Sequence, residues 1–264
     1  MKNTWVEELY KYTEFYYWEP GHLNKVTKED KKGIESFKEV QRNIRRREVP
    51  LNAIMNIAMR LMPRSIICKI FQRVIKREAD FGKELGFINI YEKIGAFKDY
   101  TQPDMVFESE TSRVFVELKI DANLTLDQVY KYIFLHGLWQ QRTNVMKKPY
   151  ILFIIKNDLQ YQWVSKERDN LFRDGCDIKD VIEYIKNKEL PLTLGKASSL
   201  EYLHKDVNTI LGDLELGWSR WSELGEILHS EINGLSLSSM SDGEETIYKL
   251  INDILVDLEN RQLW

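Results

Sequence analysis

The sequence is poor in the residues that characterise small cross-linked or disordered proteins, with two cysteines, six prolines and 13 glycines among 264 residues. Cys68 and Cys176 stand far apart and have no Cys or His partner at a metal-ligand spacing. This argues against both a disulfide framework and a structural zinc site. Hydrophobic residues make up 43% and charged residues 30% of the chain, which excludes disordered and low-complexity classes. The length suits one large domain, or a core with appended helices.

Long hydrophobic runs are also missing. The longest strongly apolar run covers residues 150–155, far short of the roughly 20 residues that a membrane helix needs. The first residues lack the apolar region of a signal peptide. We therefore expect a cytoplasmic protein with no membrane partner.

Several common catalytic motifs do not occur. The sequence has no GxxxxGK[ST] phosphate loop, no GxGxxG, no HExxH and no GxSxG. Nucleotide hydrolysis by a P-loop, dinucleotide redox chemistry, zincin proteolysis and serine-hydrolase chemistry therefore have no support in the sequence.

Charge is unevenly distributed, although the formal net charge is only −3. Residues 41–77 carry ten Lys or Arg against one acid, whereas residues 197–264 carry thirteen acids against four Lys or Arg. Two interpretations remain open: a polyanion groove with an opposing lobe, or mutual neutralisation within the fold. The same alternatives apply to Arg42, Arg45, Arg46 and Arg47, which either contact phosphates or pair with the acidic C-terminal helices.

Hydrophobic periodicity predicts an α/β protein. In residues 1–85 we expect helices over 4–17, 27–47, 51–62 and 65–85. After Gly86 we expect strands near 87–97 and over 104–108 and 114–120, a helix over 125–143 and a buried strand over 150–156. Further helices are expected over 178–188, 200–214, 218–232 and 244–258. These elements divide the chain into an N-terminal helical region (1–63), an α/β core (64–165) and a C-terminal helical region packed on the core (166–264).

Two acids on adjacent predicted strands form the candidate site. Asp104 begins one strand and Glu117 lies in the next, where residues two apart point the same way, so that Glu117 and Lys119 project together. Magnesium prefers one or two carboxylates with water and phosphate oxygens. It lowers the pKa of a bound water, which Lys119 can orient. The alternative is a surface hairpin with an exposed Glu117–Lys119 pair that contributes little to stability.

The acid-x-Lys spacing also occurs at Glu29/Lys31, Asp30/Lys32 and Asp177/Lys179. Those copies lie in polar helical patterns. Glu117 instead interrupts a hydrophobic strand, where an unpaired charge is costly. Only the copy at Glu117 and Lys119 therefore needs a functional explanation.

Pro103-Asp104 and Glu117-Leu118-Lys119 resemble the signature of the PD-(D/E)XK nuclease superfamily, over roughly residues 64–156. The resemblance implies a restriction-endonuclease-like core of helix, three strands, helix and strand, with helical additions at both ends. It implies that Asp104 and Glu117 bind the metal and that Leu118 contributes its backbone carbonyl. Gln128 and Tyr132 form a Gln-x-x-x-Tyr pair similar to that of the RecB-like and related branches, which would place both in the site.

The family commonly adds a glutamate from the first core helix, and the resemblance gives this role to Glu78 rather than Glu84. Basic residues precede and flank Glu78 on the same predicted helix. We expect these to bind nucleic-acid phosphate: Lys69, Arg73, Lys76 and Arg77.

The resulting hypothesis is a metal-dependent nuclease that uses Mg²⁺, with Mn²⁺ as a substitute, and that acts on DNA in restriction, repair or phage defence. RNA remains an alternative substrate, and a homodimer or a partner protein would supply specificity. The competing hypotheses are a catalytically inactive nuclease-fold protein that binds nucleic acid, and a protein-interaction module that uses the acidic C-terminal region.

Overall fold

The computed structural model describes residues 4–10, 48–75, 79, 81–88, 103–163, 183–184, 209–235 and 239–264. The chain divides into two compact units. One comprises residues 63–224, and the other comprises residues 1–62 together with 225–264. The candidate site lies in the 63–224 unit.

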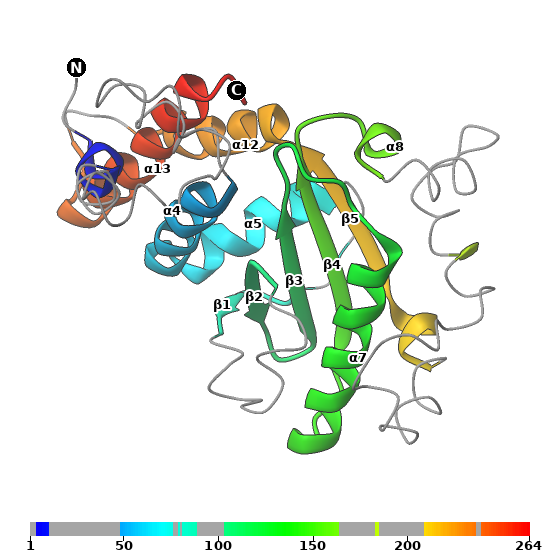
Figure 1. Ribbon diagram of the computed structural model, residues 1–264. Helices are drawn as coiled ribbons and strands as arrows, with labels where there is room; N and C mark the ends of the chain where they lie inside the picture. The colour runs from blue at the N-terminus through cyan, green and yellow to red at the C-terminus, as the bar shows by residue number, and fades with distance from the viewer. Residues whose placement is uncertain are drawn as a thin grey trace, which may run out of the picture. The chain divides into compact units, whose positions relative to one another are not determined.

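A five-stranded mixed sheet organises the 63–224 unit (Figure 1). Its strands lie in sequence order: β1 (Gly86–Phe87), β2 (Met105–Glu108), β3 (Ser112–Leu118), β4 (Lys148–Ile155) and β5 (Glu215–Arg220). The β1–β2 and β2–β3 pairs are antiparallel, whereas β3–β4 and β4–β5 are parallel. The protein is thus mixed α/β, as its periodicity predicts.

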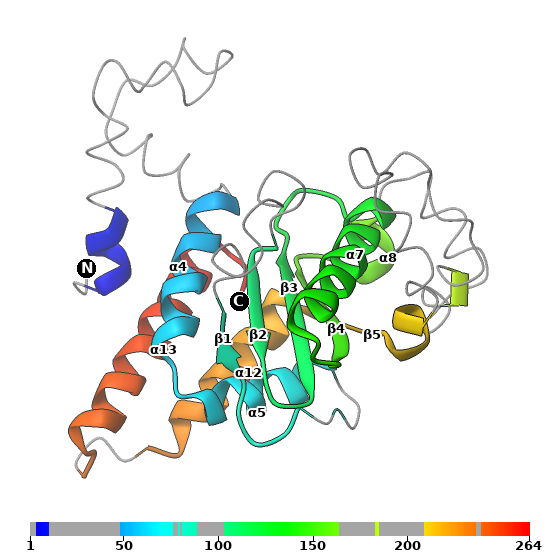
Figure 2. The same cartoon turned by 90° about the horizontal axis from the view of Figure 1, so that it is seen from below.

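Helices cover both faces of this sheet. Helix α5 (Arg64–Ile75) lies on one face and α7 (Leu126–Thr143) on the other (Figures 1 and 2). Every residue of β3 is consequently buried. This explains why the middle of β3, Val114–Val116, is an unbroken apolar run instead of alternating, as in strands with two covered faces.

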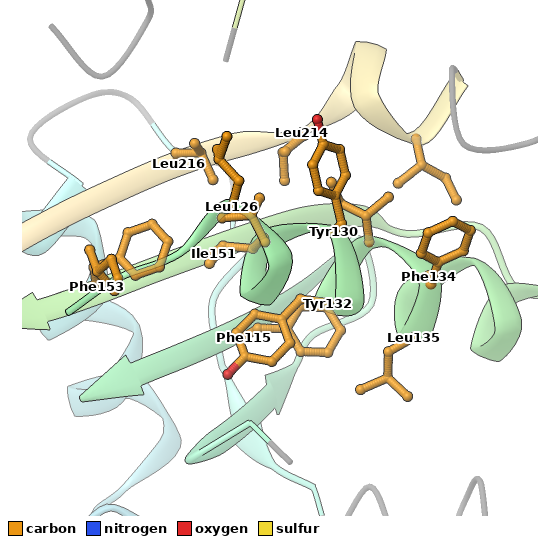
Figure 3. Packing of buried hydrophobic residues seen from close by; sticks show 14 of the residues in the cluster. Phe115, Leu126, Tyr130, Tyr132, Phe134, Leu135, Ile151, Phe153, Leu214 and Leu216 are labelled. Carbon is orange, nitrogen blue, oxygen red and sulfur yellow. The ribbon is translucent and has the colours of Figure 1, made fainter. Parts of the chain in front are cut away.

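The core between the sheet and α7 is rich in aromatic side chains. Phe115 from β3 stacks on Tyr132 from α7 with ring centroids 5.7 Å apart, and the two rings lie face to face in Figure 3. Phe153 from β4 packs edge-on against Trp163. The Phe115–Tyr132 pair thus stabilises the packing of α7 on the sheet beyond what area burial alone provides.

Helix α7 connects two parallel strands, β3 and β4, and such a pair requires a crossover element. Thr125 caps its first turn, and Asn144 closes its C-terminal end with a positive φ of 53°. The predicted helix over 125–143 is therefore confirmed. The predicted strands over 104–108, 114–120 and 150–156 are also found, each within two residues of its expected bounds.

The region after residue 165 differs from prediction. Residues 218–220 were expected to begin a helix, but Glu215–Arg220 form β5, and α12 (Trp221–Asn233) starts only afterwards. The strand arises because Leu216 and Gly217 fit a buried position beside β4, where a Cβ on Gly217 would lie 2.8 Å from Leu152. A short helix, α8 (Leu159–Gln162), follows β4. The helix expected over 65–85 ends earlier, since residues 81–85 are not helical.

In the other unit, the N-terminal residues make a polar contact with α13 (Asp242–Asn260) and a hydrophobic one with α4 (Glu48–Leu61). α4 and α13 pack together, and Ser241 caps α13 through a reciprocal bond with Glu244. The Trp5 amide donates to Asp253 at 3.0 Å, and Asp257 forms a buried ion pair with Arg261 at 2.7 Å. Two of the C-terminal acids thus have partners within this unit.

No helix in the described ranges combines the length and apolar character that crossing a bilayer requires.

A buried charge cluster lies at the end of the sheet remote from Asp104. The Arg113 side chain is fully buried and pairs with Glu108 at 2.7 Å, while Lys147 reaches the same carboxylate at 3.3 Å. Arg113 also lies over the Trp139 ring, 3.8 Å from its centroid. The cluster fixes the β2–β3 hairpin against α7, and its single acid faces two cations.

We expect Glu108→Gln to lower the unfolding free energy by about 3 kcal/mol, because removing one partner leaves a buried guanidinium without its counter-charge. Urea unfolding measures this loss. The matched control is Asp121→Asn, which removes an exposed pair with Lys156 and should cost less than about 1 kcal/mol. Equal costs for the two variants would mean that the Glu108 cluster does not stabilise the hairpin.

A second prediction concerns pH. Burial lowers the pKa of His136 to about 3, and the charge of Arg113 adds to this shift. The unfolded chain takes up a proton near pH 6.5 while folded His136 stays neutral, so stability falls as pH drops below 6.5. Between pH 6.5 and 5 the loss should be about 2 kcal/mol. The unfolding free energy of His136→Gln should depend less on pH than that of wild type. An equal pH dependence would show that His136 is not its cause.

Candidate functional site

The register of the β2–β3 hairpin brings the two predicted acids to matching positions. Met105 pairs with Val116, so the next pair outward is Asp104 and Glu117. Directly opposite residues of an antiparallel pair project from the same face, with Cβ atoms about 5 Å apart. The Asp104 Oδ2 atom also accepts the Leu118 amide N–H at 2.7 Å, which fixes its carboxylate at the end of β3.

Glu117 is the centre of a polar network. Its Oε1 atom accepts the Gln128 Nε2–H at 2.8 Å and pairs with the Lys119 ammonium at 2.7 Å. Its Oε2 atom accepts the Tyr132 hydroxyl. Lys119, Gln128 and Tyr132 therefore converge on the Glu117 carboxylate.

This network is buried. The side chains of Glu117 and Lys119 are only 4% and 10% exposed. The alternative of an exposed hairpin pair is thus wrong, and the reason is that α7 covers this face of the sheet. Burying an ionised carboxylate is costly unless hydrogen bonds and a counter-charge compensate, and Glu117 has both.

Gln128 owes its orientation to the start of α7. Thr125 and Gln128 form a capping box, in which the Thr125 hydroxyl accepts the Gln128 amide and the Gln128 Oε1 atom accepts the Thr125 amide, both at 3.3 Å. The Gln128 Oε1 atom is therefore used in the helix cap. Only the Nε2 end is left to face Glu117.

The main chain of Lys119 is held from two directions. Its N–H donates to the Ile154 carbonyl of β4 at 2.8 Å, and its carbonyl accepts the Trp221 indole N–H at 2.8 Å. The position of the lysine Cα is thus fixed by elements outside β3.

The residues present offer hard oxygen ligands for a divalent cation. Asp104 and Glu117 supply two carboxylates, which is the number that magnesium commonly takes from a protein. Within the described ranges, no group of three His, Cys, Asp or Glu side chains is placed to hold a metal. Glu78, the third ligand that the resemblance implies, lies outside the described residues, so its role stays a prediction. The proposed carbonyl contribution of Leu118 also stays a prediction.

The predicted phosphate-binding residues are only partly described. Lys69 and Arg73 lie four positions apart on the exposed side of α5, whose opposite side is buried against the sheet. Lys76 and Arg77 lie outside the described residues, as do Arg42, Arg45, Arg46 and Arg47.

Two residues that hold the site in place, Thr125 and Trp221, were not predicted from the sequence. The Thr125-x-x-Gln128 spacing is a capping-box pattern, so the role of Thr125 was detectable in principle. Trp221 lies 102 positions from Lys119, and no local pattern signals a contact over that separation.

We expect Tyr132→Phe to lower the unfolding free energy by about 2 kcal/mol, because a hydrogen bond to a charged group contributes about that amount. Tyr161→Phe is the matched control, since the Tyr161 side chain is 59% exposed. Surface changes usually stay within about 0.5 kcal/mol. Equal unfolding midpoints for both variants in urea would show that the Tyr132 hydroxyl does not stabilise Glu117.

Comparison with known proteins identifies no relative of this chain: no family model, no curated protein and no solved structure matches it. The resemblance to the PD-(D/E)XK superfamily therefore rests on the motif residues alone. Any function must be inferred from the chemistry that Asp104, Glu117 and Lys119 support.

Proposed function

We propose that this protein is a metal-dependent nuclease of the PD-(D/E)XK type that hydrolyses phosphodiester bonds in DNA. The observation that carries the proposal is the network around Glu117, which combines a second acid at the matching register position with a lysine on the same carboxylate. The site also lies at the carboxyl end of a parallel strand, where open α/β sheets commonly bind their ligands.

A magnesium or manganese ion held by Asp104 and Glu117 would supply Lewis-acid chemistry and a water of lowered pKa. The residues of the chain have separate tasks around it. Asp104 and Glu117 provide the ligand oxygens, and Gln128 and Tyr132 fix the orientation of the Glu117 carboxylate. Lys119 compensates the negative charge of Glu117 and would orient the attacking water and offset charge at the phosphate.

DNA binding is assigned to the exposed basic side chains of α5. Lys69 and Arg73 point away from the sheet and lie on one helix face, a spacing at which two side chains can contact neighbouring phosphates. A phosphate backbone recognised in this way gives affinity without sequence preference. Specificity is then left to a partner protein or a second copy of the chain.

One observation favours a second candidate, a nuclease-fold protein that binds nucleic acid or protein without cleaving. Glu117 already accepts from three donors, two of them at Oε1. A network of this kind can be purely structural, because satisfied buried polar groups also fix a unique core packing.

Cleavage assays distinguish these candidates. We expect wild type to nick or degrade plasmid DNA with Mg²⁺ or Mn²⁺ and to be inactive in EDTA, while Ca²⁺ supports binding with little cleavage. Asp104→Asn and Glu117→Gln should each lower the rate at least about a hundredfold, because the loss of the metal-ligand charge removes several kcal/mol of transition-state stabilisation.

Asp121→Asn is the matched control for these variants. It removes an acid that follows β3 but is exposed and paired with Lys156, so its cleavage rate should equal that of wild type. Full activity in EDTA, or wild-type rates in both site variants, would overturn the proposal. A folded protein that binds DNA but never cleaves would favour the second candidate.

A further inference from the structure

The main chain of Lys119, just beyond the end of β3, makes two hydrogen bonds to other elements. β3 ends at Leu118, yet the Lys119 N–H extends the β3–β4 ladder by donating to Ile154. The Lys119 carbonyl has the Trp221 indole as its donor, at 2.8 Å. Both main-chain polar groups of the lysine are therefore held, one by β4 and one by a side chain from beyond β5.

Trp221 reaches Lys119 across β4. It is the first residue of α12 and directly follows β5. The register pairs Ile154 with Leu118 on one side and with Ser219 on the other, so Lys119, Ile155 and Arg220 continue one row across three strands. Neighbouring strands lie about 4.8 Å apart, so an indole from the end of β5 has the length needed to approach β3. Trp221 is 1% exposed, so this contact is buried.

The turn that carries Trp221 is itself braced by Glu223. The Glu223 Oε2 atom accepts the Arg220 amide at 3.0 Å and the Ser219 hydroxyl at 3.1 Å. These bonds satisfy donors at the start of α12, as a capping residue does. The chain just before Trp221 is thereby fixed, and the indole N–H donates to the Lys119 carbonyl.

We propose that Trp221 is a positioning residue for Lys119, holding the lysine Cα so that its ammonium reaches Glu117 and the reacting phosphate. This inference rests on the proposed function. The lysine side chain has a flexible four-carbon stem, so the place of its Cα sets the volume that the ammonium can sample. A displacement of about 1 Å at a reacting group can lower a rate a hundredfold.

Trp221→Phe tests this role against a matched control, Trp163→Phe. Trp163 is equally buried at 1% exposure, and its indole nitrogen has no hydrogen-bond partner among the described residues. Both substitutions remove the same atoms, but only Trp221→Phe removes a donor to Lys119. We expect kcat to fall at least about tenfold for Trp221→Phe, with KM and Mn²⁺ affinity unchanged. Trp163→Phe should stay within about twofold of wild type.

A second variant separates the loss of the hydrogen bond from a folding defect in Trp221→Phe. Replacement of Trp221 by β-(3-benzothienyl)alanine keeps the two fused rings and exchanges only the N–H for sulfur. It should show the same fall in kcat at an unchanged melting temperature. Hydrogen exchange of the Lys119 amide, which needs no activity, should accelerate at least about tenfold in both Trp221 variants and not in Trp163→Phe.

The outcomes separate this inference from the proposed function. A wild type that cleaves, with Trp221 variants as active as Trp163→Phe, would overturn the positioning role and leave the nuclease proposal intact. A wild type that never cleaves would overturn the nuclease proposal and the catalytic part of this inference. Unchanged exchange of the Lys119 amide would show that Trp221 does not hold the lysine at all.

Discussion

The structure depends on the compensation of one buried carboxylate. Glu117 lies near the carboxyl end of β3, the central strand of a sheet covered on both faces, where an uncompensated charge would destabilise the fold. Lys119 supplies the counter-charge, and Gln128 and Tyr132 from α7 supply hydrogen bonds. Each of these three donors makes a further contact of its own. Together these contacts fix β3, α7 and the Glu117 carboxylate relative to one another. A hydrophobic residue at this position would need none of these contacts, and the proposed cation site would account for a charge there.

The sheet topology provides what this network needs. The antiparallel β2–β3 pair sets Asp104 opposite Glu117, and the parallel β3–β4 pair requires the crossover helix that brings Gln128 and Tyr132 over the same face. The parallel β4–β5 pair then places Trp221 at the carboxyl end of the sheet, within reach of the Lys119 carbonyl. The candidate site thus draws on three strand pairings and on the first turns of two helices.

Much of this arrangement was predictable from local sequence patterns. Periodicity located β2, β3, α7 and β4, and the two-residue spacing of Glu117 and Lys119 correctly predicted their contact. β5 was missed because Glu215–Arg220 contains Gly217 and is followed at once by α12. The helical spacing of apolar residues in α12 was therefore extended in error to Trp218, inside the strand. The contact between Trp221 and Lys119 could not be predicted, because it joins residues brought together only by the β4–β5 register. The burial of both faces of β3 likewise depends on α5, which lies far from β3 in sequence, as well as on the adjacent α7.

The central claim is that Asp104 and Glu117 form a cation site, and Mn²⁺ titration followed by electron paramagnetic resonance tests it most directly. This measurement needs no substrate and no turnover. The account predicts saturable Mn²⁺ binding by wild type, unchanged in Asp121→Asn and weakened at least about tenfold in Asp104→Asn, because one ligand charge is lost. Mn²⁺ binding of equal affinity in wild type and Asp104→Asn, with both proteins folded, would contradict the account.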